Sequence, residues 1–371
     1  SIQYILNHPL CPLQGMLLVN TDLHPISIET SAKLLKAGTN ILIKGIGLRY
    51  PVMKLNYLRL FGWNSAKKSF LEINNVWFKY STIHLSNLTI LFNNVSFTDV
   101  MITDIRSYDL CITMYHVSWN IDHSQSGNFI KLLSSISVHL SISSSSFNGT
   151  ATRIQSQYFS VKFLDVIFIA CSERRSIIEI HEQYTWAVSQ NSIQMLNVQI
   201  VGKKTEKQFN TVAFNISAAN VFTYIENVLI TNFSNALSLE NLDFPMTHQV
   251  SIKILINKSN FTNNKSPNSG AVLNIILNAN RVLMFVMRIR FCMFVNNTAE
   301  RHGGVIYAIL GSLQATEIKR WLLFGFEHSE FRNNIANLSG GSIFLGEYIS
   351  SSFIKCLFHF SKYSVKGTDL K

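Results

Sequence analysis

The chain has 371 residues, of which 47% are hydrophobic and 14% are charged, and its formal net charge is +11. This composition excludes intrinsic disorder, because disordered chains are poor in apolar residues and rich in charge, and 17 Gly and 6 Pro are too few for a collagen-like chain. The chain also holds 35 Asn, 42 Ser and 20 Thr beside only 21 acidic residues. Since Asn, Ser and Thr suit turns and strand surfaces better than helical surfaces, the composition favours an all-β fold.

Residues 1–69 contain few clear patterns, and we expect an N-terminal cap or early irregular coils there. Ile41, Ile43 and Leu48 fit the start of an early strand, whereas a cap would cover an open sheet edge. Asn20–Asp22 reads Asn-Thr-Asp, which resembles one piece of the polygalacturonase pattern. The Gly-His-Gly piece of that pattern is missing from the sequence, so this match does not predict a hydrolase.

From residue 70 to residue 360, short runs of alternating apolar residues recur, and each leads five residues later to a bulky anchor residue. In one such run Leu110, Ile112 and Met114 precede Trp119. Strict alternation indicates a strand with one buried face. The anchors are Phe78, Phe97, Trp119, Phe147, Phe168, Ile200, Ile230, Phe261, Phe294, Phe331 and Phe358. Their intervals run from 19 to 37 residues with a mean of 28, so each repeat is too short to close a core alone and must stack on its neighbours.

The three repeats around Phe261, Phe294 and Phe331 agree most closely with one another. Two residues after each anchor comes an Asn pair, and nine residues after it comes a Gly, which fits a turn that needs a positive φ. Two residues before each anchor stands Ser or Cys. These repeat positions are Asn263, Gly270, Asn296, Gly303, Asn333 and Gly340, with Ser259, Cys292 and Ser329 before the anchors. We expect a buried Asn column whose amides bond from repeat to repeat, so that Asn296→Ala destabilises the fold.

Together the repeats predict an all-β parallel β-helix, a solenoid of about ten or eleven coils. Leucine-rich repeats would need a fixed Leu pattern, helical repeats need a 3.6-residue period, and propeller blades need four strands in about 40 residues. A β-sandwich with chance alternation is the alternative. The expected organisation is a cap or early coils over residues 1–69, the β-helix over residues 70–360 and a C-terminal tail over residues 361–371.

Two repeats carry a resemblance to a known family. Phe294–Asn297 followed by Gly303–Ile306, and Phe331–Asn334 followed by Gly340–Ile343, resemble the FxxN and GGA(I/L/V) repeats of the polymorphic outer membrane protein family. The second motif departs from that pattern in its third residue, which is Val or Ser here. The motif match covers roughly residues 250–345. The resemblance implies a right-handed parallel β-helix that serves as a surface-exposed passenger or adhesin.

Residues suited to catalysis or metal binding are sparse in this sequence. Hydrolysis of a polysaccharide needs two carboxylates about 5–10 Å apart, and the eight Asp of the chain include no Asp–Asp pair. Asp99, Asp104 and Asp109 fit solvated turns better than a calcium cluster, because neighbouring repeats do not match them. His302 has no acidic or nucleophilic residue at the matching repeat position. We therefore expect no catalytic, cofactor-binding or metal-binding residue and no cofactor.

The five cysteines do not have the spacing of a zinc site or a disulfide scaffold. Cys292 and Cys356 take the same repeat position two repeats apart, with Ser329 between them. Two strand spacings amount to roughly 9–10 Å between Cα atoms, which is too far for a disulfide. We therefore expect no bond between Cys292 and Cys356.

Ten N-glycosylation sequons favour a eukaryotic secretory route. They begin at Asn87, Asn94, Asn148, Asn215, Asn232, Asn257, Asn260, Asn264, Asn296 and Asn337. The chain begins with Ser1, so we expect a processed chain or a piece of a larger protein. No basic-plus-apolar signal segment is visible, and no apolar run reaches the roughly 18–20 residues of a membrane-spanning helix. We expect an extracellular or cell-surface location.

The expected function is that of a non-enzymatic β-helix with an adhesive, binding or structural role. The alternative is a carbohydrate-active β-helix enzyme, a polysaccharide lyase or glycoside hydrolase, whose catalytic carboxylates the sequence does not reveal. Arg288 and Arg290 alternate with the apolar Met287 and Ile289, so we expect the two arginines to face solvent. The positive charge is dispersed, which favours anionic glycans or cell-surface proteins as partners and argues against nucleic acid.

Overall fold

The protein is described from a computed structural model. The described residues are 14–20, 26–29, 33–35, 40–46, 52–62, 69–104, 107–121, 130–170, 176–183, 191–202, 211–218, 220–240, 250–277, 283–310, 321–346, 349–359 and 362–363. The expectations for Asp22, for Leu48 and for the tail from residue 364 onward lie outside these ranges.

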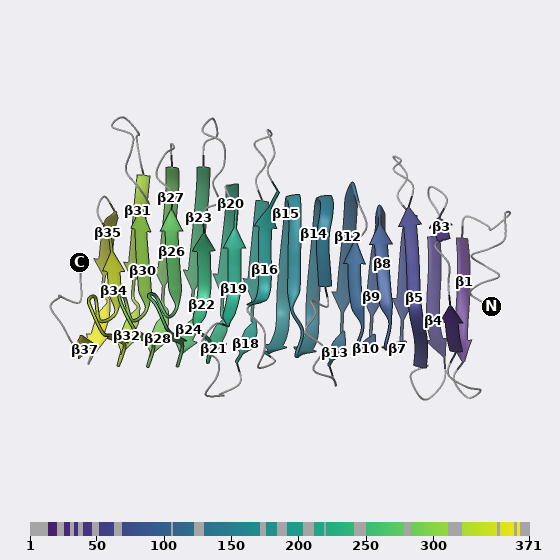
Figure 1. The fold of residues 1–371 in the computed structure, drawn as a ribbon, viewed down its shortest axis with the longest axis horizontal. Coiled ribbons are helices and arrows are strands. Elements are labelled where there is room, and N and C mark those ends of the chain that lie inside the picture. Colours follow the sequence, from purple (N-terminus) through teal and green to yellow (C-terminus); the bar gives the residue numbers. More distant parts are fainter. Residues whose placement is uncertain are drawn as a thin grey trace. The chain divides into compact units, whose positions relative to one another are not determined.

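None of the described residues is helical, and the protein is all-β with many strands paired in parallel (Figure 1). The chain divides into two compact units, Ser1–Ile167 and Phe168–Lys371, and β15 (Thr152–Ile169) contains the boundary. Alternating apolar residues give each strand one buried face, and parallel neighbours are joined by crossover connections, since a two-residue hairpin can join only antiparallel strands.

The first unit contains three parallel ladders, into which successive stretches of the chain place one strand each. The first ladder comprises β1 (Gln14–Asn20), β4 (Asn40–Ile46), β6 (Ser69–Asn74), β9 (Leu88–Asn93), β12 (Asp109–Tyr115) and part of β14 (Ile130–Asn148). The second comprises the start of β5 (Val52–Gly62), then β7 (Trp77–Lys79), β10 (Ser96–Thr98), β13 (Ser118–Asn120) and the end of β14. The third comprises β3 (Lys33–Leu35), the end of β5, β8 (Thr82–Ser86), β11 (Met101–Asp104) and the start of β14. The strand β2 (Ile26–Glu29) pairs with the first half of β5, where Ile26 and Ser27 meet Met53 and Lys54 of the second ladder.

The early strands of residues 1–69 thus join the same ladders as the later ones. In particular, β4 pairs with both β1 and β6, and its side chains Ile41 and Ile43 are buried. The described strands of this segment are therefore part of the same parallel sheet as the later strands.

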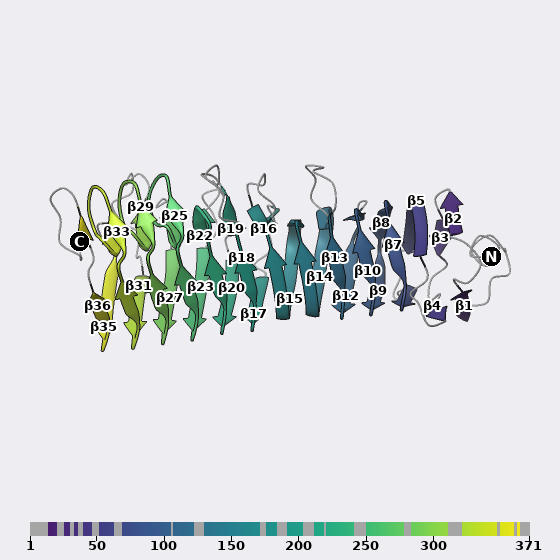
Figure 2. The ribbon, with the colours of Figure 1, turned by 90° about the horizontal axis from the view of Figure 1, so that it is seen from below.

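The second unit also consists of parallel ladders, and we call its four ladders A to D (Figures 1 and 2). Ladder A comprises β17 (Asn191–Leu196), β20 (Asn220–Glu226), β23 (Val250–Asn257), β27 (Leu283–Arg290), β31 (Trp321–Glu327) and β35 (Ser350–Ile354). Ladder B comprises β18 (Gln199–Val201), β21 (Leu229–Thr231), β24 (Asn260–Thr262), β28 (Met293–Val295), β32 (Glu330–Arg332) and β36 (Leu357–His359). Ladder C comprises β16 (Ser176–Glu182), β19 (Val212–Ser217), β22 (Asn235–Glu240), β26 (Leu273–Leu277), β30 (Ile306–Leu310) and β34 (Ile343–Leu345). Ladder D comprises β25 (Lys265–Ser266), β29 (Thr298–Ala299), β33 (Ile335–Ala336) and β37 (Lys362–Tyr363), and Figure 2 shows the first three side by side.

The anchor residues lie in register with one another, which confirms the alignment of the repeats. In the second unit Ile230 pairs with Phe261, and Phe294 lies between Phe261 and Phe331. The rings of Phe261 and Phe294 stack with centroids 5.3 Å apart, and those of Phe294 and Phe331 with centroids 4.7 Å apart. In the first unit the anchors from Phe78 to Phe147 are likewise in register. The core is therefore built from columns of like side chains, each spaced by one strand separation.

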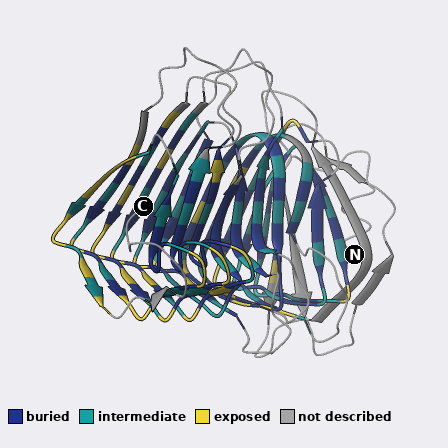
Figure 3. Cartoon of the chain, turned by 60° about the vertical axis from the view of Figure 1, so that its left-hand side comes forward, coloured by how far each residue is buried: buried dark blue, intermediate teal, exposed yellow. Residues whose placement is uncertain are grey.

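Burial alternates along the strands as the period-two pattern predicts, with dark blue residues next to teal ones in Figure 3. In β9, for example, Leu88, Ile90 and Phe92 are buried while the intervening residues are partly exposed. Apolar side chains thus face one side of each strand and polar side chains the other, which leaves the outward faces for function.

Tight turns between ladders A and B, and after ladder B, use residues with a positive φ. The residue three before the anchor takes this conformation repeatedly, for example Asn227 at 53° and Phe291 at 54°. Gly270, Gly303 and Gly340 have φ values of 62°, 58° and 62°, which confirms the prediction for these glycines. A Cβ on Gly303 would lie 1.9 Å from the carbonyl oxygen of Ile306, so only glycine fits there.

Candidate functional site

A buried ladder of asparagine amides runs through the turns that follow ladder B. Asn264, Asn297 and Asn334 are all fully buried. The Oδ1 of Asn297 accepts hydrogen bonds from the backbone N–H and the side-chain Nδ2 of Asn264, both at 3.1 Å. The Oδ1 of Asn334 accepts the same two bonds from Asn297, both at 3.0 Å. Each amide thus satisfies polar groups of two repeats inside the core.

The asparagines one residue earlier, which the sequence analysis predicted to form the buried column, lie at the surface instead. Asn263, Asn296 and Asn333 are exposed and have φ values of 56°, 55° and 53°. The Nδ2 of Asn296 donates to Oδ1 of Asn263 at 3.3 Å, which is an exposed contact. The expected buried column therefore exists, but one residue later than Asn296, because the left-handed turn residue interrupts the alternation of inward and outward side chains.

The position two residues before the anchor holds a second column of small polar side chains. The Oγ of Ser329 accepts the backbone N–H of Cys292 at 3.2 Å and donates to the carbonyl of Glu327 at 3.0 Å. Ser259 makes the same pair of bonds, accepting from Val228 at 3.2 Å and donating to Asn257 at 2.7 Å. These hydroxyls satisfy strand-end groups that would otherwise be buried without a partner.

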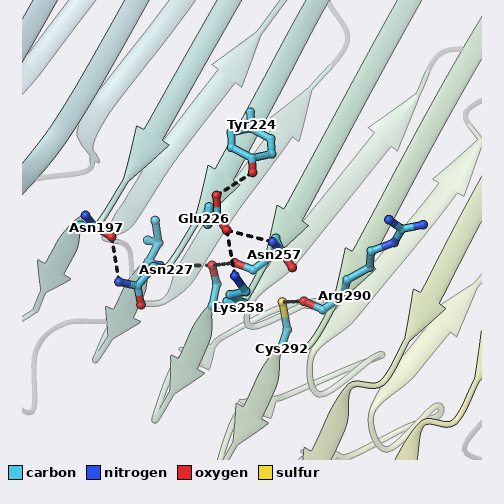
Figure 4. A network of polar contacts seen from close by, with 10 residues as sticks. Asn197, Tyr224, Glu226, Asn227, Asn257, Lys258, Arg290 and Cys292 are labelled. Atoms are coloured by element: carbon cyan, nitrogen blue, oxygen red, sulfur yellow. Dashed lines mark hydrogen bonds and ion pairs between the residues drawn. The ribbon is translucent and has the colours of Figure 1, made fainter.

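Cys292 occupies the same column between the two serines. Its Sγ donates to the carbonyl of Arg290 at 3.1 Å, as Figure 4 shows. Burial raises the pKa of the Cys292 thiol to about 12, so the thiol is a poor nucleophile at neutral pH. The ladder register puts Ser329 between Cys292 and Cys356, as the alignment predicts, and both cysteines are free thiols.

A polar network lies on the outward side of β20 and β23 (Figure 4). The hydroxyl of Tyr224 donates to Glu226 at 2.6 Å, and Nδ2 of Asn257 donates to the same carboxylate at 3.0 Å. The ammonium of Lys258 lies 3.4 Å from Glu226. The hydrogen bond from Tyr224 lowers the pKa of Glu226, and the same bond raises the pKa of Tyr224. A carboxylate with a lowered pKa stays ionised at neutral pH, so it is not available as a general acid there.

Basic and apolar side chains share the outward face of β23, β27 and β31, which we call the β27 face. Lys253, Met284, Arg288 and Leu323 are exposed there, with Met284 at 45% and Leu323 at 44%. The exposure of Arg288 confirms the sequence prediction that this side chain faces solvent. Gly325 lies in register with Arg288, and a Cβ added at Gly325 would lie 3.7 Å from Cγ of Arg288.

Arg290, the last residue of β27, also faces solvent. Its Nε lies 2.9 Å from Oε2 of Glu327 on β31, so its charge is compensated. By contrast, the structure shows no acidic partner for Lys253 or Arg288 within the ranges it describes. The β27 face therefore offers uncompensated positive charge beside exposed aliphatic groups.

Asp104 and His302, which the sequence analysis considered for metal binding and catalysis, each make local structural contacts. Asp104 does not lie in a solvated turn as expected: it is the buried last residue of β11, and its Oδ1 accepts the backbone N–H of Leu133 at 2.7 Å. His302 lies in a turn, with Nδ1 2.6 Å from Oγ of Ser339 and its ring 5.0 Å from that of Phe344. Among the described residues, no group of three or more His, Cys, Asp or Glu side chains is placed to bind a metal ion.

The sequons differ widely in exposure. Asn264 is fully buried and holds the amide ladder, so the fold leaves no room for a glycan there. Half-buried acceptors are Asn87, Asn94, Asn215, Asn232 and Asn257. Exposed acceptors are Asn148, Asn260, Asn296 and Asn337.

Several residues that matter in the structure carry no distinctive sequence signal. Lys253 and Met284 reach the β27 face only because β23 and β27 pair in that register. Asn297 is the second residue of an Asn pair in the sequence. Its burial could have been predicted if Asn296, the residue before it, had been assigned a positive φ, because that conformation shifts the alternation of inward and outward side chains by one residue. Within the described segments, no helix has the length and apolarity needed to cross a membrane.

Comparisons with known proteins complete the description of the chain. No protein-family model matches it, and searches among curated proteins and solved structures found no match.

Proposed function

We propose that this chain is a right-handed parallel β-helix of about ten or eleven coils that binds a partner at the cell surface or outside the cell. The parallel ladders and the stacked anchor column support the β-helix, since consecutive strands return to the same ladders once per repeat. The resemblance of the Phe294 and Phe331 repeats to those of polymorphic outer membrane proteins supports the adhesive role. Ten sequons support the extracellular route.

The observation that carries the binding function is the β27 face. Exposed apolar side chains on a strand face are typical of interaction surfaces. Here Met284 and Leu323 are flanked by Lys253 and Arg288, whose charges have no described acidic partner. This combination fits an anionic glycan or an acidic patch on a cell-surface protein, because charge attracts the partner and apolar contact retains it.

Binding to an array of sulfated, carboxylated and neutral glycans would test this function. The expected result is retention of anionic glycans, with binding that weakens as salt is raised. Removing two exposed charges in Lys253→Ala/Arg288→Ala should weaken binding about tenfold. Arg332→Ala is the matched control, because Arg332 lies on ladder B and its charge is compensated by Glu330.

Two outcomes would contradict the proposal. If the control variant weakened binding as much as the double variant, the β27 face would not be the binding surface. If the purified chain degraded any polysaccharide in a parallel turnover screen, the chain would be a carbohydrate-active enzyme and the adhesive function would be wrong.

A further inference from the structure

A second exposed apolar patch lies directly after β27, in the turn that leads to ladder B and at the start of β28. It consists of Phe291 and Met293, which are 54% and 40% exposed, and we call it the Phe291 patch. Phe291 lies in the turn between ladders A and B with a φ of 54°, and its ring stacks on His328 with centroids 5.0 Å apart. A bulky residue rarely takes this backbone conformation, and exposed apolar groups side by side call for a covering partner.

The neighbouring strand places a glycosylation sequon directly beside this patch. Asn260 is the first residue of β24, and it is the register partner of Met293 on β28. Parallel partners lie about 4.8 Å apart, so the side chains of Asn260 and Met293 are immediate neighbours on one face. Asn260 is exposed, and its sequon ends at Thr262.

The two other sequons of the same repeat, at Asn257 and Asn264, have their amides engaged in the fold. Asn257 is half-buried, and its Nδ2 donates to the carboxylate of Glu226 at 3.0 Å. Asn264 is fully buried, and its Nδ2, the atom that would carry the sugar, donates to Asn297 at 3.1 Å and to the carbonyl of Ile230 at 3.3 Å. A glycan on Nδ2 of Asn264 would break the amide ladder. Asn260 is therefore the acceptor that the fold leaves open in this repeat.

We propose that Asn260 carries an N-linked glycan and that its first sugars cover the Phe291 patch. The apolar C–H faces of the sugar rings pack against Met293 and Phe291, while their hydroxyls remain in water. This inference rests on the extracellular route of the proposed function, because only that route supplies the glycan. It also assigns the two apolar patches different roles, since the β27 face stays open for a partner.

Methionine oxidation gives a direct test, because Met293 and Met284 have similar exposures of 40% and 45% but only Met293 adjoins Asn260. The chain would be secreted from a eukaryotic host and treated with hydrogen peroxide, and oxidation at each methionine would be followed by peptide mass spectrometry. In the glycosylated chain Met293 should oxidise about fivefold more slowly than Met284.

Two substitutions of Thr262 form a matched pair for this experiment. Thr262→Ser keeps the sequon, whereas Thr262→Ala removes it while Asn260 stays in place. In Thr262→Ala the two methionines should oxidise within about twofold of each other, and in Thr262→Ser the protection of Met293 should persist. Asn260→Gln, which keeps an amide, is a second way to remove the glycan if Thr262→Ala proves unstable.

The outcomes separate this inference from the proposed function. Glycans on Asn148 or Asn296 without one on Asn260 would overturn the inference and leave the extracellular route intact. Glycans on none of the sequons would overturn both. If Asn260 carried a glycan and Met293 were still oxidised as fast as Met284, the sugars would not cover the patch. If Met293 were protected equally in Thr262→Ala, the protection would not come from the glycan, and the inference would be wrong.

Discussion

Thr223 places a hydroxyl between two isoleucines in a ladder of the second unit. It is fully buried, its register neighbours are Ile193 and Ile254, and its Oγ1 has no hydrogen-bond partner among the described atoms. Valine has nearly the same shape and no polar atom to desolvate. We expect Thr223→Val to raise the free energy of unfolding by about 1 kcal/mol, measured by urea denaturation.

Thr231→Val is the control for this substitution. The hydroxyl of Thr231 accepts a hydrogen bond from Thr262 at 3.0 Å, so its removal should bring no gain. A clear loss of stability in Thr223→Val would mean that its hydroxyl is satisfied in solution, for example by a buried water molecule.

The buried thiol of Cys292 predicts a pH dependence of stability. Its pKa rises from an ordinary 9.0 to about 12 in the folded chain, so between these values the unfolded chain loses a proton that the folded chain keeps. The free energy of unfolding should therefore be at its full value below about pH 9 and fall as the pH rises toward 12, by up to about 1.4 kcal/mol per pH unit.

Cys292→Ser isolates this effect, because serine occupies the same position in the neighbouring repeats at Ser259 and Ser329. Denaturation of both proteins at about pH 8 and about pH 10 should show that the original chain loses roughly 1 kcal/mol more than the variant. Equal losses in the two proteins would indicate that the Cys292 thiol ionises as it does in the unfolded chain.

At the scale of an element, the turn after ladder B depends on the amide ladder. Asn297→Ala removes the acceptor for two bonds from Asn264. It also removes the Nδ2 donor to Oδ1 of Asn334, which keeps only the bond from the backbone N–H of residue 297. We expect a loss of about 3 kcal/mol. Asn296→Gly, at the exposed neighbouring position with a positive φ, should change stability by no more than about 0.5 kcal/mol. Thermal unfolding of the two variants would decide, and a larger loss in Asn296→Gly would restore the original assignment of the column to Asn296.

The turn at Gly303 requires glycine, whereas the strand position Gly325 does not. At Gly303 an alanine Cβ would lie 1.9 Å from a carbonyl oxygen and would occupy a φ of 58°, so Gly303→Ala should cost about 3 kcal/mol or prevent folding. At Gly325 in β31, the nearest atoms are 3.7 Å from the added Cβ. Gly325→Ala should therefore be neutral or slightly stabilising in the same denaturation assay.

At the scale of the whole molecule, each unit is a set of parallel ladders without a helix among its described residues. The far-ultraviolet circular dichroism of the purified chain should accordingly be that of β-structure. A spectrum dominated by helix would contradict the fold. The positive charge is spread over both units, so charge alone does not indicate where a partner binds, whereas the β27 face does.

The amino-acid sequence by itself determined the strands, the anchor column and the glycine turns. These features follow from local rules, because alternation marks a buried face and a positive φ selects glycine. The anchors from Ile200 to Phe358 could therefore be placed in the correct register before any contact between strands was known. The outward direction of Arg288 follows from the same alternation.

Only the tertiary structure decided which asparagine of each pair is buried, which sequons are open and which residues border the exposed patches. Asn296 takes a left-handed conformation that shifts the alternation by one residue, so Asn297 points inward instead. Asn260 meets Met293 although the two are 33 residues apart in the chain, because each stands one residue before its anchor and the anchors are in register. The aligned repeats predict that pairing, whereas the exposure of each side chain depends on the turns and on the neighbouring repeats, which alternation within one strand does not encode.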